Sequence, residues 1–294
     1  MKLSLHILLL LIAASVLFSC HQPAPVTSPK MKVQDSNVNI AYTDTGKGDT
    51  TLLFVHGWAL NRGYWSSQIN YFSKKYRVVA IDMAGFGESG KNRVDWSTTA
   101  YSRDLDSVIS QLKLKNVILI GHSMAGDIVL QAAIDNPKNV IAFVGVDNFK
   151  NVGKPETAAD KKGFAFAITL LKHNFKAVAA DYFKQALFSK TTDTTIKKRI
   201  LDDVASADST IAVAAMEQGN DFDELDKLKA ADLKLYLINS DYKLTDTARL
   251  VKNKIPYLLL TVHGTGHFPM VEDVEDFNKQ LGKVIRDVGN QKSE

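Results

Sequence analysis

Cysteine is almost absent from this sequence, since Cys20 is the only one among 294 residues. An intrachain disulfide is therefore excluded. The sequence also lacks clustered metal-ligand spacings and any glycine-rich phosphate-binding loop, so we expect neither a metal nor an organic cofactor. A strong excess of one charge is missing too. The net charge is only +4, with lysine and arginine scattered among acidic residues, which favours a solvated surface and argues against nucleic acid as a partner.

The first thirty residues have the pattern of an export signal followed by a linker. Lys2 supplies a short positive region, and Ile7–Phe18 is an apolar run of twelve residues, too short to cross a bilayer as an anchor helix. The run ends in Leu17-Phe18-Ser19-Cys20, which resembles the lipobox of bacterial lipoproteins, where the cysteine is lipidated after cleavage. We therefore predict a signal peptide over 1–19, a tether over 20–30 and a lipid-anchored protein on the periplasmic face or surface of a bacterial cell envelope. The alternative is an ordinary secretory signal with a cysteine there by chance.

Beyond the tether, short apolar runs alternate with helical patterns in a chain whose hydrophobic content of 45% is typical of globular proteins. The runs suit strands buried on both faces of a parallel sheet. They are Thr51–Val55, Val78–Ile81, Val117–Ile120, Ile141–Val146, Leu233–Ile238 and Tyr257–Val262. Helical patterns cover Thr99–Leu112, Ala125–Asp135 and Val274–Val288. Strands that alternate with helices predict an α/β fold with a doubly wound, mostly parallel sheet.

Residues 154–228 interrupt this alternation, because they contain helical segments and no convincing strand. Phe164–Lys172 and Ala177–Leu187 are examples. The segment is several times longer than a usual connection, which predicts a helical cap inserted into a core of residues 31–153 and 229–294. The alternative is a set of ordinary crossover helices. The cap also carries five aromatic residues, for which packing on the core is the ordinary role and lining an apolar acyl pocket is the alternative: Phe164, Phe166, Phe175, Tyr182 and Phe183.

A serine lies in a sharp turn between a predicted strand and a predicted helix. Gly121-His122-Ser123-Met124-Ala125-Gly126 directly follows Val117–Ile120, which is the context of a nucleophile elbow. The glycine before Ser123 allows a tight turn, and small residues after it let strand and helix approach each other. Ala125 departs from the common G-x-S-x-G pattern, although alanine is still small. We predict that Ser123 is a catalytic nucleophile, the alternative being a helix-capping serine.

Three further motifs make the chain resemble the α/β-hydrolase family over nearly everything after the tether. Phe54-Val55-His56-Gly57-Trp58 resembles the family's HG turn, and Asp82–Ser89 resembles its D-x-x-G-x-G-x-S turn. Gly266-His267-Phe268 resembles the turn that presents the catalytic histidine. The resemblance implies an α/β-hydrolase fold whose oxyanion hole consists of the backbone N–H groups of Trp58 and Met124.

The same resemblance suggests which histidine acts and which does not. His267 follows the last predicted strand in a glycine-flanked loop, late in the chain, as the family order of serine, acid and histidine requires. His122 is next to Ser123, but neighbouring side chains in an elbow point apart. His56 is expected to bond loop backbone, and Asp82–Ser89 is expected to be a packed turn without a chemical role. We therefore predict His267 as the general base.

The acid of the triad has two candidates. The family usually places it after the penultimate strand, but Lys243 occupies that position on the most natural register, and Asp241 comes two residues early. Some relatives place the acid one strand earlier, which here corresponds to Asp147, at the carboxyl edge of Ile141–Val146. Active-site residues gather at this edge of such sheets. The position of each aspartate relative to the family pattern favours Asp147 over Asp241, and Asp241 is then a loop-capping residue.

Together these features predict a serine hydrolase that cleaves an ester-like bond of a small molecule, with an apolar acyl ester as the expected substrate, through an acyl-enzyme intermediate. Two kinds of enzyme on the same scaffold are alternatives, namely carbon–carbon bond hydrolases and cofactor-free haloperoxidase-like enzymes. A non-catalytic ligand-binding protein is an alternative of another class. The displaced acid favours that last alternative, whereas the intact serine and histidine favour catalysis.

Overall fold

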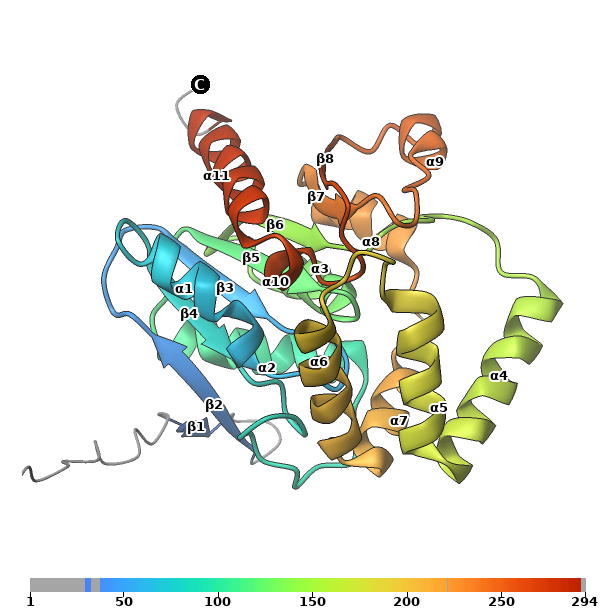
Figure 1. The fold of residues 1–294 in the computed structure, drawn as a ribbon. Coiled ribbons are helices and arrows are strands. Elements are labelled where there is room, and N and C mark those ends of the chain that lie inside the picture. Colours follow the sequence, from blue (N-terminus) through green and yellow to red (C-terminus); the bar gives the residue numbers. More distant parts are fainter. Residues whose placement is uncertain (1–29, 33–37, 221, 292–294) are drawn as a thin grey trace, which may run out of the picture.

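A computed structural model describes residues 30–32, 38–220 and 222–291. The predicted signal peptide, Cys20 and almost the whole tether lie outside these residues. The described part contains an eight-stranded sheet with the strand order β1-β2-β4-β3-β5-β6-β7-β8 (Figure 1). The strands are β1 (Lys30–Lys32), β2 (Asn39–Asp44), β3 (Thr51–Val55), β4 (Arg77–Ile81), β5 (Val117–His122), β6 (Val140–Val146), β7 (Leu235–Ser240) and β8 (Tyr257–Val262).

The predicted doubly wound, mostly parallel sheet is confirmed. Strands β3 to β8 pair in parallel, whereas β2 pairs antiparallel with both β1 and β4. All six predicted strands occur, and the largest difference is at β7, which begins at Leu235 and ends at Ser240. The sequence pattern missed β1 and β2, because β2 pairs antiparallel near the edge of the sheet and its outer half is only partly buried.

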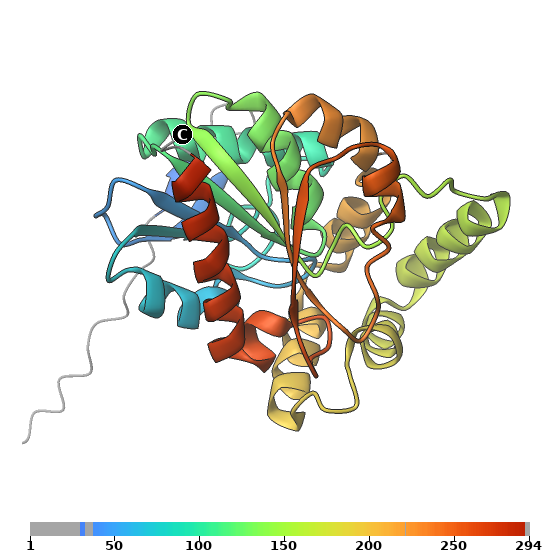
Figure 2. The same ribbon diagram turned by 90° about the horizontal axis from the view of Figure 1, so that it is seen from above.

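Helices cover both faces of the sheet. On one face, α2 (Thr98–Gln111) and α3 (Ala125–Asp135) pack together, and α8 (Glu224–Ala231) packs against α3. On the other face, α1 (Ser66–Phe72) packs against α11 (Val274–Gln291), as Figure 2 shows from above. The short helices η1 (Arg62–Trp65), α9 (Ala248–Lys252) and α10 (Pro269–Glu272) lie in the connections.

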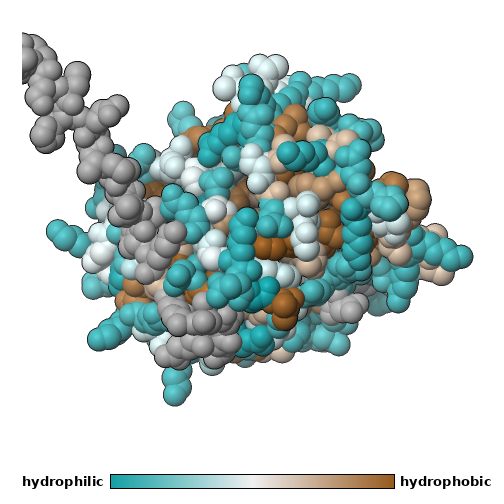
Figure 3. Space-filling model, turned by 90° about the horizontal axis from the view of Figure 1, so that it is seen from below, coloured by the Kyte–Doolittle hydropathy of each residue, from teal (hydrophilic) through white to brown (hydrophobic). Residues whose placement is uncertain are grey.

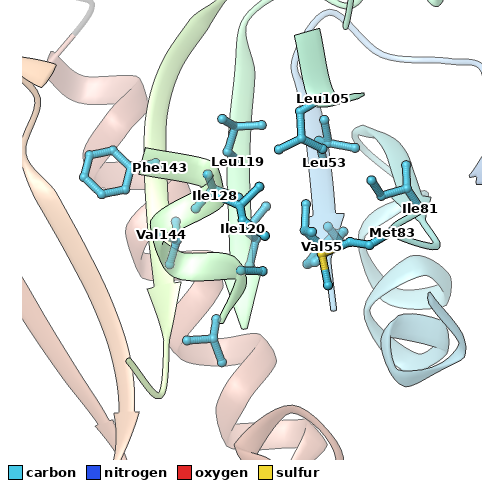
Figure 4. Close-up of a cluster of buried hydrophobic side chains, with 14 of the residues drawn as sticks. Leu53, Val55, Ile81, Met83, Leu105, Leu119, Ile120, Ile128, Phe143 and Val144 are labelled. Carbon is cyan, nitrogen blue, oxygen red and sulfur yellow. The ribbon is translucent and has the colours of Figure 1, made fainter. Parts of the chain in front are cut away.

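The core lies between these layers. Leu105 of α2 and Ile128 of α3 are buried among side chains of β3, β5 and β6, including Leu53 and Phe143 (Figure 4). Burial of such apolar surface is the main stabilising contribution, about 25 cal/mol per Å². The outer surface differs, since hydrophilic side chains interrupt the hydrophobic ones on the face in Figure 3.

Between β6 and β7 the described residues form helices joined by loops, with no strand. They form α4 (Ala158–His173), α5 (Phe175–Tyr182), the π-helix η2 (Phe183–Leu187), α6 (Thr194–Ser206) and α7 (Ser209–Gln218), followed by α8. Helix α4 projects away from the sheet in both ribbon views (Figures 1 and 2). The predicted cap boundary at residue 228 falls within α8, which packs against α3 of the core.

Candidate active site

The turn between β5 and α3 holds Ser123 in a conformation that few residues adopt. Its φ is +53°, in the left-handed region, where a non-glycine side chain is strained. A Cβ on Gly121 would overlap the carbonyl oxygen of Ala125, so only glycine fits before the turn. The turn is fixed by the Ser123 N–H, which donates to the Val146 carbonyl, and by the Asn148 amide, which donates to the Ser123 carbonyl.

Three of the predicted site residues form one chain of hydrogen bonds. The Ser123 hydroxyl lies 2.8 Å from Nε2 of His267, and Nδ1 of the same ring lies 2.6 Å from Oδ2 of Asp147. The side chain of Asp147 is fully buried, and His267 is only 9% exposed. A proton on Nδ1 that is donated to Asp147 leaves the Nε2 lone pair directed at Ser123, which is the tautomer a general base requires.

The other oxygen of Asp147 also has several partners. Oδ1 accepts hydrogen bonds from the Ser240 N–H and hydroxyl, at 2.9 and 2.5 Å, and from Nζ of Lys150 at 2.8 Å. Burial alone would raise the pKa of Asp147. The hydrogen bonds and charges of His267 and Lys150 outweigh burial, so the pKa lies well below its ordinary value. Asp147 is therefore ionised at physiological pH and able to stabilise a protonated His267.

Asp241, the alternative acid, has a different histidine as its partner. Its Oδ2 lies 2.9 Å from Nδ1 of His263, and its Oδ1 accepts from the Gly264 N–H at 3.0 Å. The bond with His263 lowers the pKa of Asp241. Because His263 is exposed, this pair lies at the surface, where it holds the loop that follows β8. Lys243, at the family's usual acid position, is exposed and contributes its carbonyl to Lys150.

The loop that carries His267 is tied to both the core and the cap. The His267 N–H donates to the carbonyl of Leu187 in η2, and its own carbonyl accepts from Nε2 of His122 at 2.7 Å. His122 is buried, and burial is the main reason that its pKa falls to about 3. His122 therefore stays neutral and acts as a fixed donor that holds the backbone of His267.

The HG turn after β3 lies directly against the elbow. A Cβ on Gly57 would lie 2.6 Å from the His122 ring and 3.2 Å from Cβ of Ser123, so a larger residue would displace the nucleophile. His56 contacts loop backbone, as predicted: its Nδ1 donates to the Gly57 carbonyl and its Nε2 accepts from the Met83 N–H. In the Asp82–Ser89 turn, the Asp82 carboxylate accepts from Arg62 and the Glu88 N–H, which gives it a structural role.

A cavity of about 250 Å³ opens beside Ser123. Trp58 and Met124, whose N–H groups are predicted to form the oxyanion hole, both line it. Of the five cap aromatics, Phe164, Tyr182 and Phe183 line this cavity, whereas Phe175 packs on Trp58 and Phe166 is 64% exposed. The remaining lining residues come from both layers: Leu60, Thr98, His122, Ser123, Asp127, Leu187, Ala215, Met216, Gly219, Asn220, His267 and Phe268.

Sequence reasoning missed two contributors to this site, Lys150 and Ser240. Ser240 is the last residue of β7, and Asp147 follows the neighbouring strand β6, with Val146 in register with Ile238. The carboxyl ends of adjacent parallel strands meet at one edge, so their order in the sheet would have identified Ser240. Nothing in the sequence pattern pointed to Lys150, three residues after Asp147.

Among residues 30–32, 38–220 and 222–291, no group of three or more His, Cys, Asp or Glu side chains could hold a metal ion. In the same part of the chain, no helix is long and apolar enough to cross a membrane.

Comparison with known proteins gives the family. The model of the alpha/beta hydrolase fold matches residues 50–196, which is half of the chain, and the chain therefore belongs to the α/β-hydrolase fold family. The AB hydrolase superfamily protein YisY of Bacillus subtilis is 26% identical over 260 residues, which cover 85% of this chain and 96% of YisY.

Two other proteins show how far the similarity extends. An uncharacterized protein of Mycobacterium bovis is 32% identical over 100 residues, and the match spans only 29% of its length and 34% of this chain. An esterase from Thermogutta terrifontis superposes with a TM-score of 0.76 at 20% identity, covering 89% of this chain and 98% of that structure. At this identity the superposition shows the fold.

Proposed function

We propose that the protein is a serine hydrolase that cleaves an ester-like bond of a small molecule through an acyl-enzyme intermediate. The observation that carries the proposal is the hydrogen-bond chain Ser123–His267–Asp147, which ends at a cavity. A serine hydroxyl is a weak nucleophile unless an adjacent base removes its proton. Here the low pKa of Asp147 supports the proposal, because an ionised carboxylate beside Nδ1 favours the tautomer that a general base requires.

In the first step, His267 takes the proton of Ser123 as Oγ attacks the carbonyl carbon. Negative charge develops on the carbonyl oxygen, and the N–H groups of Trp58 and Met124 are proposed to stabilise it. One such donor is worth about 3 kcal/mol in a well-studied serine protease. His267 then gives its proton to the departing alcohol, which leaves the acyl group on Ser123. In the second step, His267 activates a water molecule that releases the acid and restores the free serine.

The test of this proposal is a labelling and turnover experiment on the protein without its first 30 residues. A fluorophosphonate probe should label Ser123 rapidly, since only an activated serine reacts fast. A panel of esters, amides and lactones of graded chain length should show turnover of the esters. Slow labelling together with ligand binding but no turnover would instead support a non-catalytic binding protein.

We further propose that the protein is exported and held at the bacterial cell envelope by a lipid on Cys20. The support is the sequence alone: an apolar run, a small residue and the only cysteine coincide at 7–20, and residues 21–30 contain three prolines. A tether of this composition would leave the folded part free to meet small substrates near a membrane.

The Cys20→Ser variant should remain unprocessed or become soluble, because the substitution removes the thiol that is lipidated. Wild-type protein expressed in a bacterium should begin at Cys20 and partition into detergent. Mass spectrometry of the mature N-terminus and Triton X-114 partitioning measure both. A wild-type N-terminus beyond residue 20 would contradict the lipoprotein proposal and favour an ordinary secretory signal.

A further inference from the structure

Asp127 is an acidic side chain in a cavity that is otherwise mostly apolar. It lies in the first turn of α3, four residues after Ser123. Among the described residues that line the cavity, it is the only Asp or Glu, and none is Lys or Arg.

Asp127 has no hydrogen bond or ion pair with any residue in the part of the chain that the structure describes. A partly buried carboxylate such as this one is destabilised unless a donor or a cation compensates it. The charged group that acts on Asp127 is a second acid, Glu224 at the start of α8, and its repulsion destabilises the ionised form of Asp127 further. The arrangement therefore places two acidic groups near each other in the first turns of α3 and α8, and no lysine or arginine lines the cavity to compensate Asp127.

Burial and the neighbouring charge have the expected effect on protonation. Burial first, and then repulsion by Glu224, raises the pKa of Asp127 well above its ordinary value. The pKa of Glu224 rises to about 7 through burial and the nearby Asp223. Both carboxyls thus resist ionisation, and a cation beside Asp127 would favour its ionised form.

We propose that Asp127 binds a protonated amino group on the part of the substrate that does not react, so that the preferred substrates are small esters bearing an amine. This inference rests on the proposed serine hydrolase function. It also changes the expected substrate from a plain apolar acyl ester to an ester that carries an amine. Ser123 and Asp127 line the same cavity, so a substrate bound there can present its carbonyl to Ser123 and an amine on its acyl chain to Asp127.

The chemistry of the reaction favours such a partner. Without a cation beside it, Asp127 either stays protonated or, once ionised, opposes the negative charge that develops on the oxyanion, because charges interact strongly over short distances in a poorly hydrated site. A substrate ammonium beside Asp127 would neutralise this opposition. Substrates with the amine should therefore gain in kcat/KM over neutral substrates of the same shape.

A purely structural role for Asp127 makes a different prediction. An acid in the first turn of a helix interacts favourably with the helix dipole, by about 0.3–1 kcal/mol. Its replacement would then lower the thermal midpoint and leave the ratio between two substrates unchanged. Substrate preference therefore separates the binding role from the structural role.

The experiment compares three 4-nitrophenyl esters that differ only at the end of the acyl chain: 6-aminohexanoate, 6-hydroxyhexanoate and heptanoate. In the wild-type protein, kcat/KM for the amino ester should exceed that for heptanoate by at least about tenfold, a difference of 1.4 kcal/mol. In Asp127→Asn this preference should disappear. The matched control is Asp241→Asn, outside the cavity, which should keep the wild-type preference. A wild-type preference for the hydroxy ester or for heptanoate overturns the proposal, as does an unchanged preference in Asp127→Asn.

A binding measurement without turnover keeps this inference separate from the proposed function. Hexylammonium should bind the Ser123→Ala protein in calorimetry, and Ser123→Ala/Asp127→Asn should bind it at least about tenfold more weakly. If Ser123 is labelled and esters turn over but hexylammonium does not bind, the amine site is wrong and the hydrolase stands. If hexylammonium binds through Asp127 and no ester turns over, the hydrolase is wrong and the amine site stands.

Discussion

Ser123→Ala is expected to abolish hydrolysis and fluorophosphonate labelling while the fold stays intact. The substitution removes the only atom that can form the acyl-enzyme bond, Oγ, which is 2.8 Å from the base. In a well-studied serine protease, loss of the nucleophile costs about a millionfold in kcat. The same order is expected here, measured as kcat on the best ester and as probe adduct by mass spectrometry.

The fold should survive because alanine fits the space of serine. The substituted residue would keep the backbone at φ near +53°, and the turn is held by backbone bonds to Val146 and by Asn148. The thermal midpoint should therefore change by only a few degrees. Ser110→Ala, an exposed position in α2, is the matched control and should keep full activity and labelling. Activity or labelling of Ser123→Ala above a trace would contradict the assignment of the nucleophile.

Asp147→Asn is expected to lower turnover by orders of magnitude, about ten-thousandfold by comparison with serine proteases. The reason is the proton on His267. Ser240 and Lys150 both donate to Oδ1 of Asp147, so the oxygen of the new amide stays there and its NH₂ group faces Nδ1. Nδ1 must then accept a hydrogen bond, the ring proton moves to Nε2, and Nε2 can no longer take the proton of Ser123.

Some loss of stability should accompany this loss of turnover. The substitution removes the negative charge that pairs with Lys150. The Lys150 side chain is only 13% exposed, and its ammonium group would then face a neutral amide oxygen. Because the pKa of Asp147 is depressed in the folded state, its ionised form stabilises the protein above the unfolded pKa near 4, and Asp147→Asn forfeits this contribution at neutral pH. Turnover must therefore be expressed per folded molecule, with the thermal midpoint measured in parallel.

Asp241→Asn is the matched comparison and should keep most of its activity. Its carboxylate bonds His263 and the Gly264 N–H at the surface, so its loss weakens one loop and leaves His267 with its partner. The reverse pattern, an active Asp147→Asn and an inactive Asp241→Asn, would make Asp241 the acid. Full turnover in both variants would mean that Ser123 and His267 act without a carboxylate.

Much of the fold and site could be predicted from local patterns. Apolar runs bounded by turns predicted six strands because parallel strands are buried on both faces, and β3 and β8 have the predicted bounds. The elbow could be predicted because its requirements are local, namely a strand, a glycine and small residues around one serine. The less buried antiparallel strand β2 could not, since its sequence Asn-Ile-Ala-Tyr-Thr-Asp has no continuous apolar run.

The sequence by itself determined the α/β class, the strand–serine–helix turn and the histidine loop, because each depends on residues that are close together in the chain. Only the tertiary structure decided which aspartate meets His267. Both acids follow adjacent strands, and a difference of one strand in the sheet determines whether a carboxylate lies beside His267 or beside His263. The same holds for Lys150 and Ser240 behind Asp147, and for Asp127 in the cavity. These contacts join residues up to 120 positions apart, and the physical reason is that spatial neighbours across a parallel sheet leave no periodic signal in the chain.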